Sequence, residues 1–100
     1  MEIEYEYNAE KNMKLKAERG ISFEEIIYYI NSGYLIEIIQ HPNKNKYASQ
    51  WFYVVDVEGY VYLVLFVRDG QKVFLKTIFP SRKHTKKYRE QHIKTQDKQL

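Results

Sequence analysis

Three apolar and aromatic segments follow one another closely between residues 51 and 79. They are separated by two short turn sequences, Glu58-Gly59 and Arg68-Asp69-Gly70-Gln71. Strands joined by turns this short can pair only in the antiparallel sense, so the three segments predict a meander. The middle segment, Tyr60 to Val67, is apolar almost throughout, which favours a central strand covered on one face and partly on the other.

Two helices and one further strand are predicted before this meander. Asn8 is placed to cap the first helix and Gly20 to end it. Ser22 and Gly33 bound the second helix in the same way. The segment from Tyr34 to Ile39 has the β-branched and aromatic composition of a strand. Together with the meander, this strand predicts a four-stranded antiparallel sheet.

The two ends of the chain complete the expected fold. Ile3, Tyr5 and Tyr7 alternate with glutamates, which is the pattern of a half-buried strand with one wet face. After Pro80, Ser81 is placed to cap a basic helix. The sequence therefore predicts an α+β fold, in which an N-terminal strand and two helices pack on the four-stranded antiparallel meander sheet and a basic C-terminal helix follows.

Composition and length are those of a single domain without cysteine. One hundred residues with 44% hydrophobic content can close one modest core. Residues 1–90 are expected to form this domain and residues 91–100 a polar, frayed tail. The absence of cysteine excludes disulfides and thiolate metal sites. No signal peptide or membrane-spanning run is recognisable, so a soluble, cytoplasmic protein is expected.

Positive charge is concentrated toward the C-terminal end. Residues 1–40 hold four basic and eight acidic side chains, whereas residues 81–100 hold seven basic and two acidic ones. A basic end attracts phosphates, a membrane surface or an acidic partner, and the simpler alternative is a solvated tail. The three histidines, His41, His84 and His92, have no carboxylate at ligand spacing, so neither a metal site nor a cofactor is expected.

The cluster from Ser81 to Tyr88 is the strongest candidate for chemistry. Cleavage of RNA without a metal needs a base, cationic donors for the phosphate and a proton for the leaving oxygen. Arg82 offers a planar fork to phosphate oxygens, and His84 titrates near neutral pH. The candidate catalytic residues are Arg82, Lys83, His84, Tyr88 and, from the first helix, Arg19, and the candidate RNA-binding residues are Lys44, Lys46, Lys86 and Lys87. For His84 or Tyr88 taken alone, a solvated helix surface is the simpler interpretation.

Aromatic residues raise a separate possibility, the stacking of nucleobases. Tyr47 and Trp51 flank the lysine-containing loop and are the best candidates for such stacking. A structural role in a small core is the interpretation favoured for both.

Two passages of the sequence resemble the BrnT-type toxins. Tyr5-Glu6-Tyr7-Asn8 and Arg19-Gly20-Ile21-Ser22-Phe23-Glu24-Glu25 are similar to the opening of that family, and the passage from Lys76 to Thr85 is similar to its closing strand and helix. The resemblance covers about residues 3–88. It implies a RelE-like fold, an endoribonuclease toxin of a type II toxin–antitoxin pair, and a DNA-binding antitoxin that wraps the toxin.

Individual positions of this pattern differ in how well they match. Arg82 stands where the family also has arginine, whereas Arg19 replaces the histidine before the glycine. Tyr88 and His92 stand where the family has glutamate and tyrosine. A binding module that uses the same basic edge without catalysis is the main alternative, and a structural protein that dimerises through a sheet edge is a further one.

Overall fold

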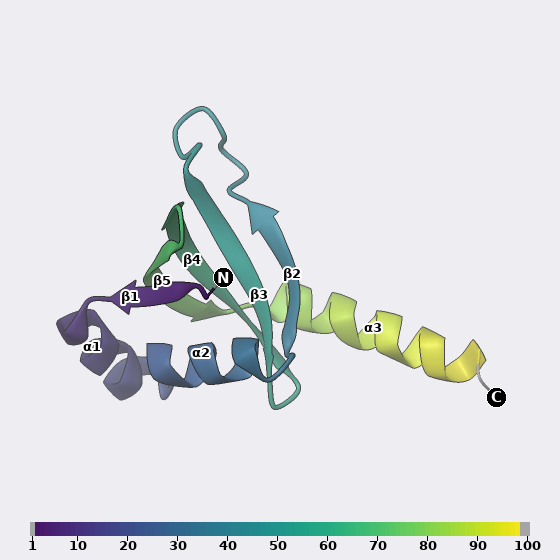
Figure 1. Ribbon diagram of the computed structural model, residues 1–100. Helices are drawn as coiled ribbons and strands as arrows, with labels where there is room; N and C mark the ends of the chain where they lie inside the picture. Colours follow the sequence, from purple (N-terminus) through teal and green to yellow (C-terminus); the bar gives the residue numbers. More distant parts are fainter. Residues whose placement is uncertain (1, 99–100) are drawn as a thin grey trace.

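The computed structural model describes the backbone of residues 2–98 and the side chains of residues 2–91. The elements follow the order β1 (Glu4–Tyr7), α1 (Ala9–Arg19), α2 (Phe23–Asn31), β2 (Leu35–Gln40), β3 (Gln50–Val57), β4 (Tyr60–Asp69), β5 (Lys72–Pro80) and α3 (Arg82–Lys98). Figure 1 shows the sheet with α1 and α2 on one side and α3 projecting past its edge. Within residues 2–98, no helix has the length and apolar character needed to cross a membrane.

The sheet has five strands in the order β1-β5-β4-β3-β2, with β4 at its centre. Strands β2 to β5 pair antiparallel in sequence order, which confirms the predicted meander and its central strand. The expectation of a purely antiparallel four-stranded sheet is wrong, because β1 pairs parallel with β5 from Glu4↔Lys72 to Tyr7↔Leu75. The alternating pattern of β1 reveals which of its faces is wet, but it carries no information about a neighbour more than sixty residues away.

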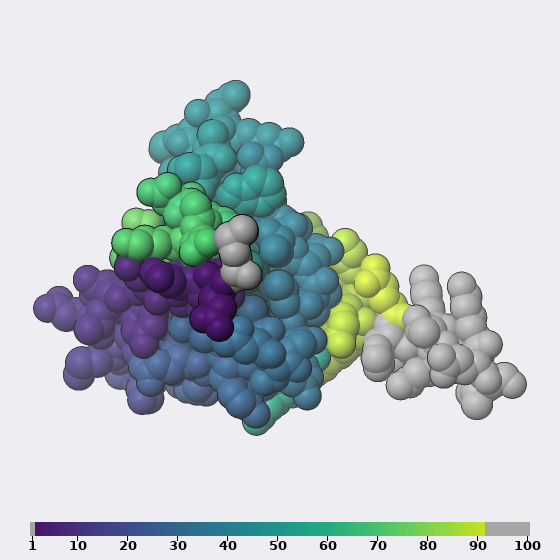
Figure 2. Space-filling view, viewed as in Figure 1, coloured from purple at the N-terminus to yellow at the C-terminus, as the bar shows by residue number. Residues whose placement is uncertain are grey.

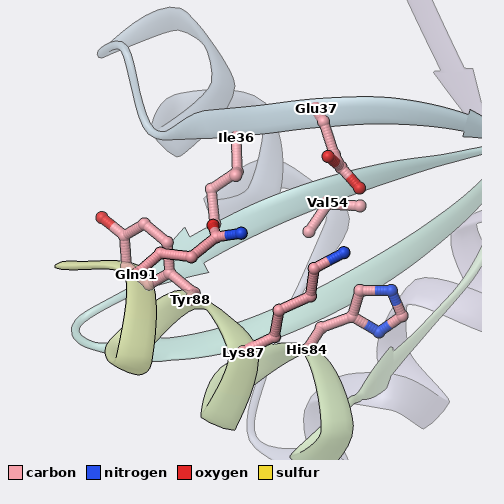
Figure 3. A pocket seen from close by; sticks show the side chains of 7 residues that line it. All are labelled: Ile36, Glu37, Val54, His84, Lys87, Tyr88 and Gln91. Carbon is pink, nitrogen blue, oxygen red and sulfur yellow. The ribbon is translucent and has the colours of Figure 1, made fainter. Parts of the chain in front are cut away.

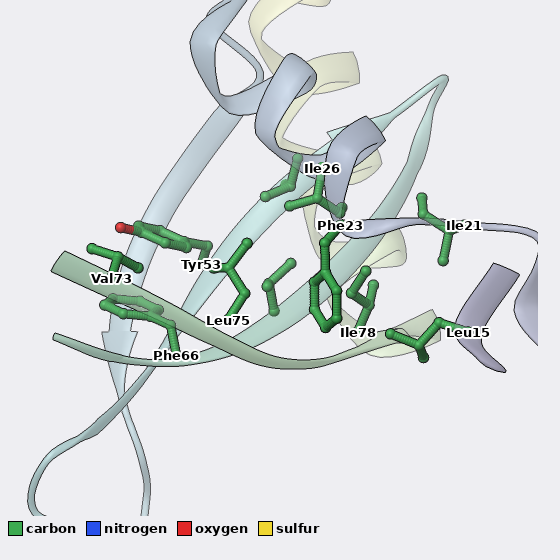
Figure 4. Packing of buried hydrophobic residues seen from close by; sticks show 11 residues of the cluster. Leu15, Ile21, Phe23, Ile26, Tyr53, Phe66, Val73, Leu75 and Ile78 are labelled. Atoms are coloured by element: carbon green, nitrogen blue, oxygen red, sulfur yellow. The ribbon is translucent and has the colours of Figure 1, made fainter. Parts of the chain in front are cut away.

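Each face of the sheet has its own apolar cluster. The larger one lies under α1 and α2 and includes Leu15, Ile21, Phe23, Ile26, Tyr53, Val55, Val64, Phe66, Val73, Leu75 and Ile78 (Figure 4). The smaller one contains Phe52, Val54, Val61 and Leu63, and Tyr88 of α3 packs against it. Adjacent residues such as Val54 and Val55 belong to different clusters because strand side chains alternate between faces. α3 therefore covers the face opposite to α1 and α2.

Local hydrogen bonds explain where the first two helices begin and end. The side chains of Asn8 and Ser22 accept hydrogen bonds from backbone N–H groups in the first turns of α1 and α2, as predicted. Gly20 ends α1 in the left-handed conformation, with φ 67°. Asn12 was not foreseen: it is buried, and its Oδ1 accepts a 2.7 Å hydrogen bond from the backbone of Phe23, which fixes α2 against α1.

The expected boundary between the domain and a tail falls inside α3. The backbone of α3 is helical through Lys98. Residues 99–100 lie outside the described part, and so do the side chains of residues 92–98, including His92. Fraying of residues 91–100 stays a prediction.

The buried side chain of Tyr53 leads to a prediction about how the stability of the fold changes at alkaline pH. Its side chain is buried, and burial followed by the hydrogen bond with Tyr5 raises the pKa of Tyr53 from 10.0 to about 12. Between these values the unfolded chain loses this proton while the folded chain keeps it, so the free energy of unfolding should fall as the pH rises through this window. Urea unfolding across about pH 9 to 11 measures the fall. In Tyr53→Phe the fall should be smaller, and an unchanged slope would contradict the assignment.

Candidate functional site

The first turn of α3 is attached to the start of β4. The hydroxyl of Ser81 accepts a 3.2 Å hydrogen bond from the backbone N–H of His84, which confirms Ser81 as the helix cap. The same hydroxyl lies 2.8 Å from Nδ1 of the His84 ring. The backbone N–H of Ser81 donates a 2.9 Å hydrogen bond to the carbonyl of Val61. His84 therefore serves the cap at the beginning of the helix.

Thr85 fixes α3 to the sheet from inside the helix. It is 4% exposed, and its hydroxyl accepts a 2.8 Å hydrogen bond from the backbone N–H of Val61. The hydroxyl donates in turn to the carbonyl of Ser81, at 2.7 Å. This residue was not among the predicted ones, because a threonine one turn after a cap gives no distinctive signal in a sequence.

The next turn of α3 is anchored to the turn between β3 and β4. Arg89 donates a 3.3 Å hydrogen bond to the carbonyl of Gly59, and the hydroxyl of Tyr88 is hydrogen-bonded to the carboxylate of Asp56. Burial and then the neighbouring Asp56 carboxylate raise the pKa of Tyr88 above its ordinary value. Asp56 also accepts a 2.8 Å hydrogen bond from the backbone of Gly59. Tyr88 thus keeps its proton and anchors the helix.

A cationic groove runs along one flank of α3. Its volume is about 390 Å³, and its lining residues are Tyr60, Arg82, Thr85, Lys86, Arg89 and Glu90. We call it the Arg82 groove. The three cations recur at spacings of four and three residues, which places them on one side of a helix. The side chains of Arg82 and Lys86 are exposed, and neither makes a hydrogen bond or ion pair with another described residue.

The opposite flank of α3 faces β2 and β3 across a much smaller hollow. Its volume is about 50 Å³, and it is lined by Ile36, Glu37, Val54, His84, Lys87, Tyr88 and Gln91. Figure 3 shows Gln91 reaching toward Ile36 and Lys87 toward Glu37 on β2, with His84 and Tyr88 to either side. The predicted catalytic cluster is therefore divided: Arg82 lines the groove, while His84 and Tyr88 lie on the other flank of the helix.

The remaining predicted residues do not line the Arg82 groove. The guanidinium of Arg19 donates a hydrogen bond to the backbone carbonyl of Ile78 on β5. Lys83 is exposed and lines neither hollow beside α3. Lys44 and Lys46 belong to the loop between β2 and β3, which forms the tip of the molecule far from α3, as Figure 2 shows.

Four groove residues were missing from the predicted site, namely Tyr60, Thr85, Arg89 and Glu90. Arg89 and Glu90 could have been included by extending the helical spacing from Arg82 through Lys86. Tyr60 could not, since it reaches the groove only through the β4–β5 register, in which Tyr62 pairs with Pro80.

No group of three or more histidine, aspartate or glutamate side chains among the described residues is arranged to hold a metal ion. Compared with models of protein families, with curated proteins and with solved structures, the chain gives no match in any of the three. The function is therefore argued from the groove itself.

Proposed function

We propose that the chain is a metal-independent endoribonuclease, the cytoplasmic toxin of a type II toxin–antitoxin pair with a RelE-like fold, and that it binds RNA in the Arg82 groove. Its protein partner in this proposal is a cognate DNA-binding antitoxin. The observation that supports the proposal is the convergence of Arg82, Lys86 and Arg89 on one concave flank of α3. Cations gathered in a concavity attract a phosphate backbone and stabilise the negative charge that develops during its cleavage.

Arg82 is the residue best placed to hold the scissile phosphate. Its side chain is exposed on the first residue of α3, and Ser81 alone separates it from the end of β5. A planar guanidinium can donate two parallel hydrogen bonds to phosphate oxygens. Lys86, one turn further along the same flank, adds a compact positive charge.

Proton transfer in this proposal is assigned to residues of the groove. Glu90 is the carboxylate that lines it, and it accepts the proton of the attacking 2′-hydroxyl. The ammonium group of Lys86 supplies the proton for the leaving 5′-oxygen. The ring of Tyr60 offers a surface on which the base beside the scissile phosphate stacks. His84 and Tyr88, which hold α3 in place, act as positioning residues.

A binding module without catalysis is the second candidate. Its support is that His84 is engaged with the helix cap and Tyr88 with Asp56, which gives both side chains a structural role. Incubation of the purified protein with end-labelled RNA and a chelator separates the two candidates. Cleavage supports the ribonuclease, whereas salt-sensitive binding of RNA that stays intact supports the binding module.

Two neighbouring lysines provide a matched test of the groove. Lys86 lines the Arg82 groove, and Lys87 lines the hollow on the other flank. We expect Lys86→Gln to weaken RNA binding several-fold and to lower the salt dependence by about one charge, whereas Lys87→Gln should have a much smaller effect. Fluorescence anisotropy at several salt concentrations measures both. Equal losses in the two variants would place the binding surface elsewhere.

A further inference from the structure

A further hollow, lined mainly by aromatic side chains, lies on the face of the sheet that α1 and α2 cover in part. Its volume is about 310 Å³, and its lining residues are Ile38, Trp51, Tyr53, Phe66 and Arg68. This volume is at the lower end of the range of about 300–1,000 Å³ that is usual for small-molecule pockets. We call it the Trp51 hollow.

The hollow lies where the two helices no longer cover the sheet. In Figure 4, Tyr53 and Phe66 stand at the end of the large cluster opposite to Leu15 and Ile21. Phe66 and Tyr60 are six residues apart on β4, so the Trp51 hollow and the Arg82 groove are separated by about 20 Å along the strand.

The aromatic wall of the hollow is held rigidly. The rings of Tyr53 and Phe66 stack at 3.9 Å between centroids and 13° between planes. Both residues are buried, and the hydroxyl of Tyr53 is hydrogen-bonded to Tyr5. Trp51 is half-buried and Ile38 is 50% exposed, so these two side chains form the accessible part of the wall.

The charge at the rim of the hollow is positive. Nε of Arg68 donates a 2.8 Å hydrogen bond to the carbonyl of Gly70, which orients the guanidinium. The positive charge of Arg68 acts on the hydroxyls of both Tyr5 and Tyr53. None of the described residues that line the hollow is acidic. A flat apolar wall beside an oriented cation matches a planar ring that carries a nearby phosphate.

We propose that the Trp51 hollow binds one nucleobase of single-stranded RNA, stacked on Trp51, with Arg68 binding the adjacent phosphate. The proposal rests on the proposed function for its choice of RNA and adds a second contact, about 20 Å from the Arg82 groove. An apolar segment of a second copy of the chain is the competing occupant, and the experiment includes an outcome for it.

Trp51 itself reports on the hollow, because it is the only tryptophan of the chain. The full chain is titrated with a dinucleotide, which is too short to reach both sites, and with ribose 5-phosphate, which lacks a base. We expect the dinucleotide to quench the fluorescence of Trp51 and ribose 5-phosphate to leave it unchanged. Lack of quenching by the dinucleotide overturns the proposal. An emission spectrum that changes with protein concentration alone, as self-association at the hollow would cause, overturns it as well.

A charge introduced at the rim tests the site without altering the core. Ile38→Glu is expected to weaken dinucleotide binding about ten-fold, because a carboxylate repels the phosphate and disturbs the stack. The matched control is Tyr28→Glu on α2, where Tyr28 is 65% exposed and lies outside both sites. It should bind as the unchanged protein does, and equal losses in the two variants overturn the assignment.

The Arg82→Ala variant separates this inference from the proposed function. Quenching by the dinucleotide should persist in Arg82→Ala, since Arg82 lines the groove and not the hollow. If RNA cleavage depends on Arg82 but the dinucleotide does not quench Trp51, the hollow proposal fails and the ribonuclease stands. If quenching occurs and no cleavage depends on Arg82, the ribonuclease fails and the nucleotide site stands.

Discussion

Arg82→Ala is expected to slow RNA cleavage by about 100-fold or more, the usual effect of removing one donor that stabilises a developing negative charge. The side chain is exposed at the start of α3, and it lines the groove beside Lys86 and Arg89. Its removal leaves the hydrogen bonds of Ser81 and Thr85 at the helix start unchanged, so the free energy of unfolding should change by less than about 0.5 kcal/mol. Single-turnover cleavage in the presence of a chelator gives the rate, and urea unfolding gives the stability.

Lys83→Ala is the control for this prediction. Lys83 follows Arg82 directly and is also exposed, but it lines neither hollow beside α3. Its truncation removes the same charge from the same turn and should leave most of the cleavage rate. Full activity of Arg82→Ala would refute the role of Arg82. An equal loss in both variants would show that the positive charge at the start of α3 matters and not the position of Arg82 in the groove.

Thr85→Val is expected to lower the free energy of unfolding by about 2 kcal/mol and to weaken RNA binding as well. Valine has nearly the shape of threonine, but it leaves the N–H of Val61 without its acceptor in a buried place. It also removes the bond from the hydroxyl to the carbonyl of Ser81. Because the bond from Val61 joins the start of α3 to β4, its loss should loosen the helix that carries the groove.

Two further substitutions serve as controls. Thr85→Ser removes the methyl group and keeps the hydroxyl, whereas Thr77→Val replaces a threonine at another position. Thr85→Ser keeps the hydroxyl and should recover most of the stability and of the RNA binding. Thr77→Val on β5 replaces a half-buried threonine whose side chain makes no hydrogen bond with another described residue, so its effect should stay within about 0.5 kcal/mol. Urea unfolding and anisotropy compare the variants, and equal stability of Thr85→Val and the unchanged protein would contradict the anchoring role.

The parts of the fold that depend on neighbours in sequence were predictable. The caps at Asn8, Ser22 and Ser81 and the antiparallel meander follow from contacts within a few residues, so their signals are present in short stretches of sequence. The place of β1 was not predictable in this way. Its parallel partner β5 is separated from it along the chain by α1, α2 and three strands, and alternation alone does not identify a neighbouring strand.

The sequence indicated where cationic side chains gather, but not how the helix divides them between its flanks. The start of α3 does carry a cationic groove, and Arg82 and Lys86 line it. The sequence analysis treated the cluster from Ser81 to Tyr88 as one site, whereas a helix turns about 100° per residue and sends alternate members to different flanks. His84 and Tyr88 are consequently committed to the cap and to Asp56, a residue on β3 that no local pattern links to α3.

The two-residue turn between β3 and β4 helps to set the position of α3, so its length can affect activity in proteins with this fold. Glu58 and Gly59 both have positive φ, at 54° and 88°, and Gly59 together with Asp56 receives the second turn of α3. A longer or shorter turn would move these acceptors, and the helix would pivot with them. Sequence changes in the β3–β4 turn would then shift the cations of α3 relative to Tyr60 on β4, although every groove residue would still be present in the sequence.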